Sequence, residues 1–203
     1  MRKLISSEML LLSILVLGGI FVWSCKTGIE PSPEPGVVRV TLQSDPADTT
    51  LVIVTDTLGL HTYDRFGVTI FQGKLYRDSS YILLFPDLES YRTRDQDFNV
   101  LEWDSTTGTY MRYTVYETEV PPGNWDKLEF GMTADQLKIG TFRVGVELPT
   151  QADRLMTLAE EITIAEGDTT VINLQIQPFQ SVARYGDQFI FNRKVQILSV
   201  QRN

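Results

Sequence analysis

The feature that most constrains the fold is an alternation of apolar and polar residues that recurs in short segments from Gly36 onward. Val38, Val40 and Leu42 alternate with polar residues, and a β-strand places such residues on one face. Further short segments with this pattern, or rich in β-branched and aromatic residues, are 51–54, 67–71, 81–85, 110–116, 127–130, 140–148, 161–164, 171–176, 188–191 and 195–200. Turn-forming residues separate them at 44–46, 121–124 and 166–168, so we predict strands joined by tight turns.

This arrangement predicts the fold class. The strand segments do not alternate with helices, and only 133–138 and 151–159 could form a helical turn or two. The chain has 203 residues, of which 42% are hydrophobic, enough for one domain with its own core. We find no internal repeat. We therefore predict one all-β domain, an antiparallel β-sandwich spanning 37–203, and read 81–85 as a buried strand.

The amino-terminal segment has the pattern of an export signal. Arg2 and Lys3 precede an apolar run from Met9 to Trp23, which is shorter than the ~20 residues of a membrane-spanning helix. The run ends in Val-Trp-Ser-Cys at 22–25. This resembles the lipobox of bacterial lipoproteins, with Trp23 departing from the small or β-branched residue usual there. We predict a lipoprotein signal peptide over 1–24, cleaved between Ser24 and Cys25.

Cys25 is the only cysteine of the chain, so no disulfide partner exists for it. Lipidation would account for a single thiol in an exported protein; an uncleaved signal anchor with an incidental cysteine is the alternative. The resemblance implies a diacylglycerol thioether on Cys25 and usually an N-acyl chain, which makes membrane lipid a partner. Lys26 follows, where aspartate would indicate inner-membrane retention. The expected location is the bacterial cell envelope, with the outer membrane favoured over the inner one.

A proline-rich tether follows the lipidated cysteine over 25–36. Three prolines and two glycines lie between Lys26 and Gly36, and alternate prolines favour an extended path without a core.

Several segments resemble an uncharacterised family of bacterial lipoprotein domains with an immunoglobulin- or prealbumin-like β-sandwich. Their order along the chain carries the resemblance, and they are 36–42, 44–48, 120–128, 162–170, 181–182 and 189–197. Lys194 stands where that family tends to have proline, and 55–109 has no counterpart. The resemblance implies fold and location and brings no chemistry with it.

The charge excludes one class of partner. The net charge is −8, and loss of Arg2, Lys3 and Glu8 with the signal peptide leaves 16 basic and 25 acidic residues, or −9. Such a surface repels nucleic acid, which we exclude as a partner.

Catalytic and metal-binding patterns are weak. His61 is the only histidine; with no nucleophile elbow and the cysteine assigned to lipid, we predict no enzymatic activity and no zinc site. Asp95, Asp97 and Asn99 offer oxygen ligands at alternate positions, a weak calcium candidate. The alternative is a solvated loop, because Val100 and Thr106 replace the glycine and glutamate of helix-flanked calcium loops. We expect no other cofactor besides the covalent lipid.

Aromatic residues gather in one stretch and would suit sugar rings or a protein partner if they shared an exposed face. They are Trp103, Tyr110, Tyr113, Tyr116 and Trp125. Alternation puts Tyr110 and Tyr116 on one face and Tyr113 on the other, so we expect at least one of the two sets in the core.

Three functions stay open. The leading interpretation is a non-enzymatic envelope lipoprotein whose sandwich binds an envelope protein or a glycan, or serves a structural role. A carbohydrate-binding module is the second, and would need exposed aromatics flanked by polar groups. A carboxylate-dependent hydrolase is the third and least favoured, because spacing singles out no acid pair among Asp64, Glu89, Glu102, Asp104, Glu117 and Glu119.

Overall fold

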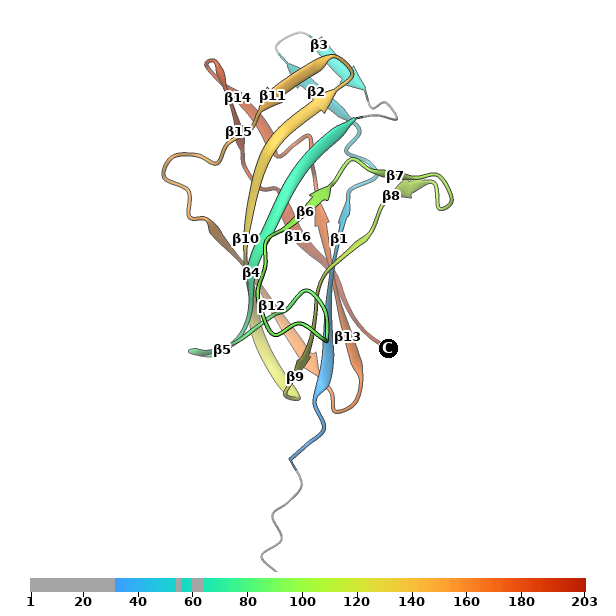
Figure 1. Ribbon diagram of the computed structural model, residues 1–203, viewed down its shortest axis with the longest axis vertical. Helices are drawn as coiled ribbons and strands as arrows, with labels where there is room; N and C mark the ends of the chain where they lie inside the picture. The colour runs from blue at the N-terminus through green and yellow to red at the C-terminus, as the bar shows by residue number, and fades with distance from the viewer. Residues whose placement is uncertain (1–31, 54–55, 60–63) are drawn as a thin grey trace, which may run out of the picture. The chain divides into compact units, whose positions relative to one another are not determined.

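The computed structural model describes residues 32–53, 56–59 and 64–203. The chain divides into two compact units, Met1–Ser32 and Pro33–Asn203. Every regular element described is a β-strand, and the strands of the second unit form two facing sheets (Figure 1). In the described part of the chain, no helix is long and apolar enough to cross a membrane.

The first sheet has four strands in the order β16-β13-β1-β9. They are β1 (Gly36–Ser44), β9 (Tyr113–Val120), β13 (Thr169–Ile176) and β16 (Val195–Arg202). The strand β1 runs antiparallel to β9 but parallel to β13. The parallel pair departs from a purely antiparallel sandwich, and the long connection between β1 and β13 makes it sterically feasible.

The second sheet has six strands built on two long ones, β4 (Arg65–Arg77) and β10 (Gly123–Ile139), which pair with each other. Two short strands, β5 (Ser80–Leu83) and β6 (Gln96–Asn99), flank β4. Two more, β11 (Phe142–Gly145) and β12 (Leu155–Ile164), flank β10. The sheet is therefore four strands wide at each end: β5-β4-β10-β12 at one end and β6-β4-β10-β11 at the other.

Three two-stranded hairpins complete the unit. They pair β2 (Thr50–Ile53) with β3 (Asp56–Gly59), β7 (Trp103–Asp104) with β8 (Thr109–Tyr110), and β14 (Val182–Tyr185) with β15 (Gln188–Phe191). In Figure 1, β1 begins at the lower end of the sandwich, while β11 and the hairpins β2–β3 and β14–β15 lie at the upper end.

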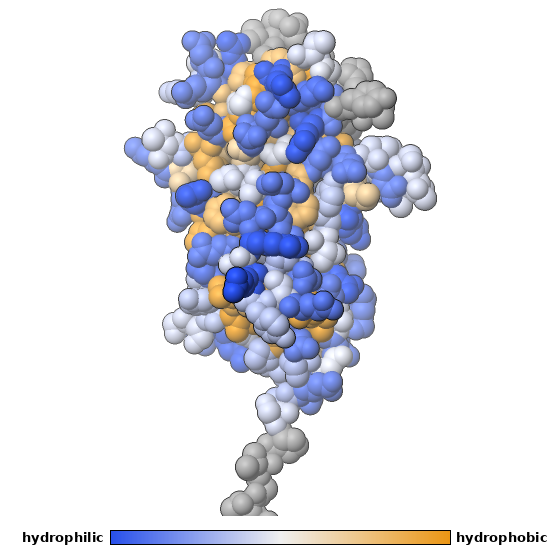
Figure 2. Space-filling model, viewed as in Figure 1, coloured by the Kyte–Doolittle hydropathy of each residue, from blue (hydrophilic) through white to orange (hydrophobic). Residues whose placement is uncertain are grey.

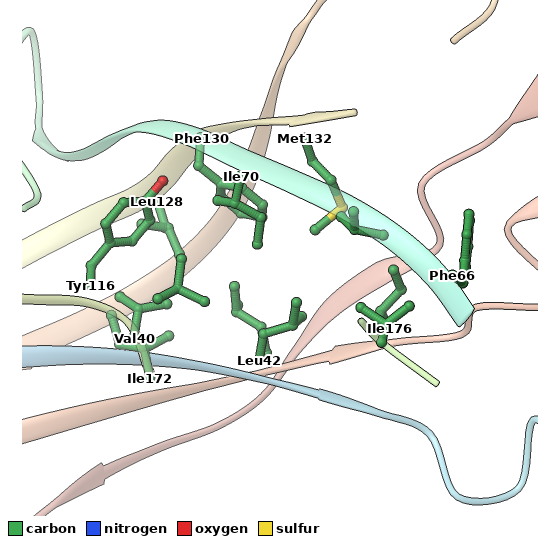
Figure 3. Packing of buried hydrophobic residues seen from close by; sticks show 14 of the residues in the cluster. Val40, Leu42, Phe66, Ile70, Tyr116, Leu128, Phe130, Met132, Ile172 and Ile176 are labelled. Carbon is green, nitrogen blue, oxygen red and sulfur yellow. The ribbon is translucent and has the colours of Figure 1, made fainter. Parts of the chain in front are cut away.

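The core lies between the two sheets (Figure 3). Val40, Leu42 and Ile172 of the four-stranded sheet point toward Ile70 and Phe130 of the six-stranded sheet. Each such side chain contributes about 1.5–3 kcal/mol on burial. The alternation of apolar and polar residues in the sequence predicted this inner face. Hydrophilic residues cover much of the visible surface (Figure 2).

The all-β sandwich is confirmed, and most predicted strand segments fall within observed strands. The helical turns are wrong: 133–138 continues β10, and 155–159 begins β12. Pairing with neighbouring strands decides these segments, as in Thr133 opposite Thr69, because tertiary contacts override weak local preferences. Two boundaries also differ. Gly140 has a φ of +57° in the turn between β10 and β11, and Gly36, expected at the end of the tether, begins β1.

Candidate functional site: the outer face of the six-stranded sheet

A β-bulge in β4 sets which residues reach the outer face. Gln72 and Gly73 together oppose Phe130, where the pairing with β10 shifts register. Gln72 has a φ of +54°, and Gly73 is buried. The extra residue shifts the inward–outward alternation of β4 by one position. Leu75 therefore points into the core, while Lys74 and Tyr76 on either side of it face outward.

Cross-strand pairing collects five side chains on this face. Lys74 lies opposite Glu129, while Tyr76 lies opposite both Lys127 and Tyr81. We call these five residues the tyrosine–lysine cluster. They come from three neighbouring strands, β5, β4 and β10, near the end of the sheet where β4 ends.

Glu129 is the polar centre of the cluster. One of its carboxylate oxygens accepts hydrogen bonds from Lys74 Nζ and from Tyr76 Oη, both at 3.0 Å. The Lys74 and Glu129 side chains are only 14% and 17% exposed, so water screens this ion pair less than an open surface pair. The carboxylate therefore fixes the positions of a lysine and a tyrosine at once.

The protonation equilibria follow from these contacts. The hydrogen bond to Glu129 raises the pKa of Lys74. Partial burial disfavours ionisation of Glu129, but hydrogen bonds from Lys74 and Tyr76 outweigh it and lower the pKa of the carboxyl. Desolvation, with the hydrogen bond to Glu129, raises the pKa of Tyr76. Near neutral pH the cluster therefore holds an ammonium, a carboxylate and a neutral phenol.

The two tyrosine rings sit beside this ion pair. Their centroids are 5.4 Å apart, and the ring planes are inclined by 43°. Lys127 Nζ lies 4.5 Å from the Tyr76 ring centroid, and Lys74 Nζ lies 5.2 Å from that of Tyr81. Tyr81 is nevertheless 53% exposed. Lys74 therefore lies against part of the Tyr81 ring, and about half of the residue is open to solvent.

This arrangement suits the apolar face of a sugar ring with hydroxyl groups at its rim. The open side of Tyr81 offers an aromatic surface. Lys127 Nζ is a donor 4.5 Å from the centroid of the neighbouring Tyr76 ring, and Thr157 Oγ1 of β12 donates to Glu129 Oε2 at 3.5 Å. The two rings are inclined by 43° to each other, so they do not form one flat strip.

The aromatic stretch identified from sequence lies elsewhere. Tyr110 and Tyr116 are buried, which confirms that one set belongs to the core. Tyr113 is partly buried, and its hydroxyl donates to the Asn99 carbonyl at 3.0 Å. Trp125 is buried beneath the Arg77 guanidinium, and Trp103 is 50% exposed on the hairpin β7–β8.

Sequence reasoning missed Tyr76 and misjudged Tyr81. The segment 81–85 looked like a buried strand, but Tyr81 and Leu83 are exposed. Because β5 is a short edge strand, its outward residues have no covering layer. The polar–apolar–polar order of Lys74, Leu75 and Tyr76 could have indicated that Tyr76 faces outward. The bulge at Gln72 interrupts this alternation with respect to the preceding residues of the strand.

The calcium candidate gains no support from its surroundings and stays a prediction. Asp97 accepts a hydrogen bond from Thr69 Oγ1 at 2.6 Å. Asn99 Oδ1 accepts from the backbone N–H groups of Phe66 and Leu101. Asp95 is exposed. Across 32–53, 56–59 and 64–203, no group of three or more His, Cys, Asp or Glu residues is placed to hold a metal ion.

The acids considered for catalysis are dispersed and mostly engaged in local contacts. Asp64 Oδ1 accepts from Gly140 N at 2.7 Å, and Glu102 accepts from the Tyr113 hydroxyl. Hydrogen bonds from the backbone of Thr106 and from Thr107 lower the pKa of Asp104. The remaining three are Glu117, which pairs with Arg39, and Glu89 and Glu119, which are exposed. Ser24, Cys25 and His61 lie outside the described residues.

Comparisons with protein-family models, with curated proteins and with solved structures found no match for this chain.

Proposed function

We propose that the chain is a lipid-anchored, non-enzymatic binding protein of the bacterial cell envelope, and that the tyrosine–lysine cluster binds a glycan. The observation that carries the glycan assignment is the half-exposed ring of Tyr81 beside the ordered polar group of Lys74 and Glu129. The lipobox-like end of the apolar run at Cys25 supports the anchor.

The physical reason for a glycan is the combination of groups. Sugars present an axial C–H face that packs on aromatic rings and hydroxyls that need hydrogen-bond partners. Tyr81 supplies the ring, while Lys127 supplies a donor and Glu129 an acceptor. Because Glu129 already holds Lys74 and Tyr76, little side-chain entropy remains to be lost on binding.

Titration calorimetry with soluble oligosaccharides tests this proposal. We would titrate the purified protein with oligomers of glucose, of galactose and of N-acetylglucosamine. At least one series should bind, and Tyr81→Ala should weaken that binding about tenfold, which corresponds to ~1.4 kcal/mol of ring contact. Tyr91→Ala is the matched control, because Tyr91 is 87% exposed and lies outside the cluster.

Two outcomes would overturn the glycan assignment. One is the absence of binding to all three series at millimolar sugar. The other is binding that Tyr81→Ala and Tyr91→Ala leave equally strong. Thermal unfolding of both variants would show that they are folded, since both side chains are exposed.

A further inference from the structure

A row of basic residues crosses the six-stranded sheet at the end away from the tyrosine–lysine cluster. Lys138 of β10 lies directly opposite Arg65 of β4 on one side and Arg143 of β11 on the other. Their chain neighbours Phe66 and Leu137 are buried, so the three cations share the outer face. Directly opposed residues have Cβ atoms about 5 Å apart, and like charges at that spacing repel each other.

The row lies beside a hollow. Arg65, Lys138 and Arg143, together with Gly67 and Gln136 of the adjoining strands, line a depression of about 320 Å³. Gly67 faces outward two residues from Arg65, and a Cβ placed on it would meet nothing within 4 Å. The missing side chain therefore leaves open space beside three positive charges.

These cations lack partners within the described residues. None of the three forms an ion pair or donates a side-chain hydrogen bond there. Five other basic residues of this acidic protein pair with carboxylates: Arg39, Lys74, Arg94, Arg184 and Arg202. Among the described residues, Asp135 is the one carboxylate that lines the hollow, so this lining carries three positive charges and one negative charge, a sum of +2.

We propose that this hollow binds the dianionic phosphoryl group of a phosphorylated ligand. A phosphate dianion matches the charge of +2. The guanidinium groups of Arg65 and Arg143 can each donate two N–H bonds to neighbouring phosphate oxygens, and Lys138 adds a point charge between them. An anion there also relieves the repulsion within the row.

The site is independent of the glycan assignment. Lys138 lies nine positions after Glu129 on β10, which amounts to about 30 Å along an extended strand. A ligand at the hollow therefore contacts none of the tyrosine–lysine cluster, and the two proposals fail or succeed separately.

Phosphorus NMR and titration calorimetry with glucose 6-phosphate test the proposal on the full protein. We expect line broadening and saturable binding that weaken as salt rises. Unphosphorylated glucose and the monoanionic diester glycerophosphoglycerol should bind at least tenfold more weakly. Equal binding of the diester would overturn the dianion assignment and favour a lipid headgroup.

Four variants locate the site. Lys138→Gln and Arg143→Gln should each weaken binding about tenfold, a typical loss for one charge-assisted hydrogen bond. Gly67→Leu should block binding while retaining every charge, because its side chain fills the open space. Asp135→Asn should strengthen binding severalfold. Arg92→Gln, which removes an exposed charge from a loop outside the hollow, should leave binding unchanged.

The unfolding temperature of Lys138→Gln shows whether a loss of binding reflects a loss of folding. Removing Lys138 relieves like-charge repulsion, so Lys138→Gln should unfold at the same or a higher temperature than the parent protein. Phosphate binding that survives in Lys138→Gln and Gly67→Leu would overturn the proposal. Tyr81→Ala should leave phosphate binding intact.

Discussion

The Tyr116 ring lies directly against Gly73, across the interface between the two sheets. A Cβ built on Gly73 would lie 2.5 Å from Tyr116 Cζ, too close for any side chain. The Tyr116 hydroxyl is buried and has no hydrogen-bond partner among the described residues. Burial accordingly raises its pKa far above the usual value. The ring thus makes close van der Waals contact with Gly73, while its hydroxyl oxygen bears a desolvation cost that no hydrogen bond offsets.

Tyr116→Phe should therefore stabilise the protein. Removing a buried hydroxyl without a partner recovers part of a desolvation cost of about 1–3 kcal/mol. Tyr110→Phe is the matched control, because the buried Tyr110 hydroxyl donates to the Asp48 carbonyl at 3.3 Å, and its loss should cost about 1 kcal/mol. Urea unfolding of the two variants measures the difference, and a destabilised Tyr116→Phe would contradict this account.

Gly73→Ala should destabilise the protein by about 1–3 kcal/mol, the usual range for overpacking a core. The Tyr116 ring cannot move away easily, because it is buried between the sheets. Gly67→Ala in the same strand is the control, since its Cβ meets open space. Urea unfolding that gave equal stabilities for the two variants would show that the Tyr116 ring yields.

The alternation of residues predicted the strands of the core well, because burial on one face imposes a period of two. It could not predict the parallel pairing of β1 with β13, since partner choice depends on which strands meet after collapse. It also misread 133–138 as a segment for a helical turn. Thr133 and Gln136 face outward from a strand of 17 residues, and pairing on both sides of that strand fixes it.

The candidate site was harder to foresee. Tyr76 and Tyr81 are neighbours only because β4 and β5 form a hairpin, and Glu129 joins them from a strand 53 residues away in sequence. The bulge at Gln72 then decides which side chains face outward. Sequence spacing contains neither piece of information, so the prediction favoured the aromatic stretch at 103–125, most of which serves the core.

Tyrosine burial predicts a loss of stability in alkali. Burial, with the nearby charges of Asp48 and Asp45, raises the pKa of Tyr110 to about 12. The folded protein thus keeps a proton that the unfolded chain loses near pH 10. The contribution of Tyr110 to the free energy of unfolding is complete below pH 10 and falls as pH rises from 10 toward 12. Urea unfolding across this range should show the decline, and Tyr110→Phe should reduce its slope. An equally steep decline in the parent and in Tyr110→Phe would show that Tyr110 is not the group responsible.

Asp48 joins the β1–β2 connection to the β13–β14 connection. Its Oδ2 accepts backbone hydrogen bonds from Phe179 at 2.8 Å and Gln180 at 3.2 Å. Burial nevertheless raises its pKa, because desolvation outweighs these bonds. The folded state therefore holds its proton more tightly, and this group's contribution to stability is greatest below pH 3.8 and is lost as pH rises through the raised pKa.

Asp48→Asn and Asp48→Ala should therefore differ. Asparagine keeps an oxygen acceptor for both N–H groups and buries no charge, so its stability relative to the parent should increase between pH 4 and 7. Alanine leaves two backbone donors without an acceptor and should cost about 1–3 kcal/mol. Thermal unfolding over this pH range checks both, and equal losses in the two variants would show that the carboxylate has another role.

The proposed lipid anchor can be tested at Cys25. Cys25→Ser removes the thiol that a diacylglycerol thioether requires, so the variant should stay as precursor or appear as soluble protein. Two or more acyl chains are needed for stable anchoring, since one binds membranes at only about 10⁴ M⁻¹. Incorporation of labelled palmitate therefore distinguishes the acylated parent from a precursor that still carries the apolar run. Thr27→Ser, which retains the thiol and lies beyond the cleavage site, is the control for export. A Cys25→Ser protein that incorporates as much label as the parent would overturn acylation at Cys25.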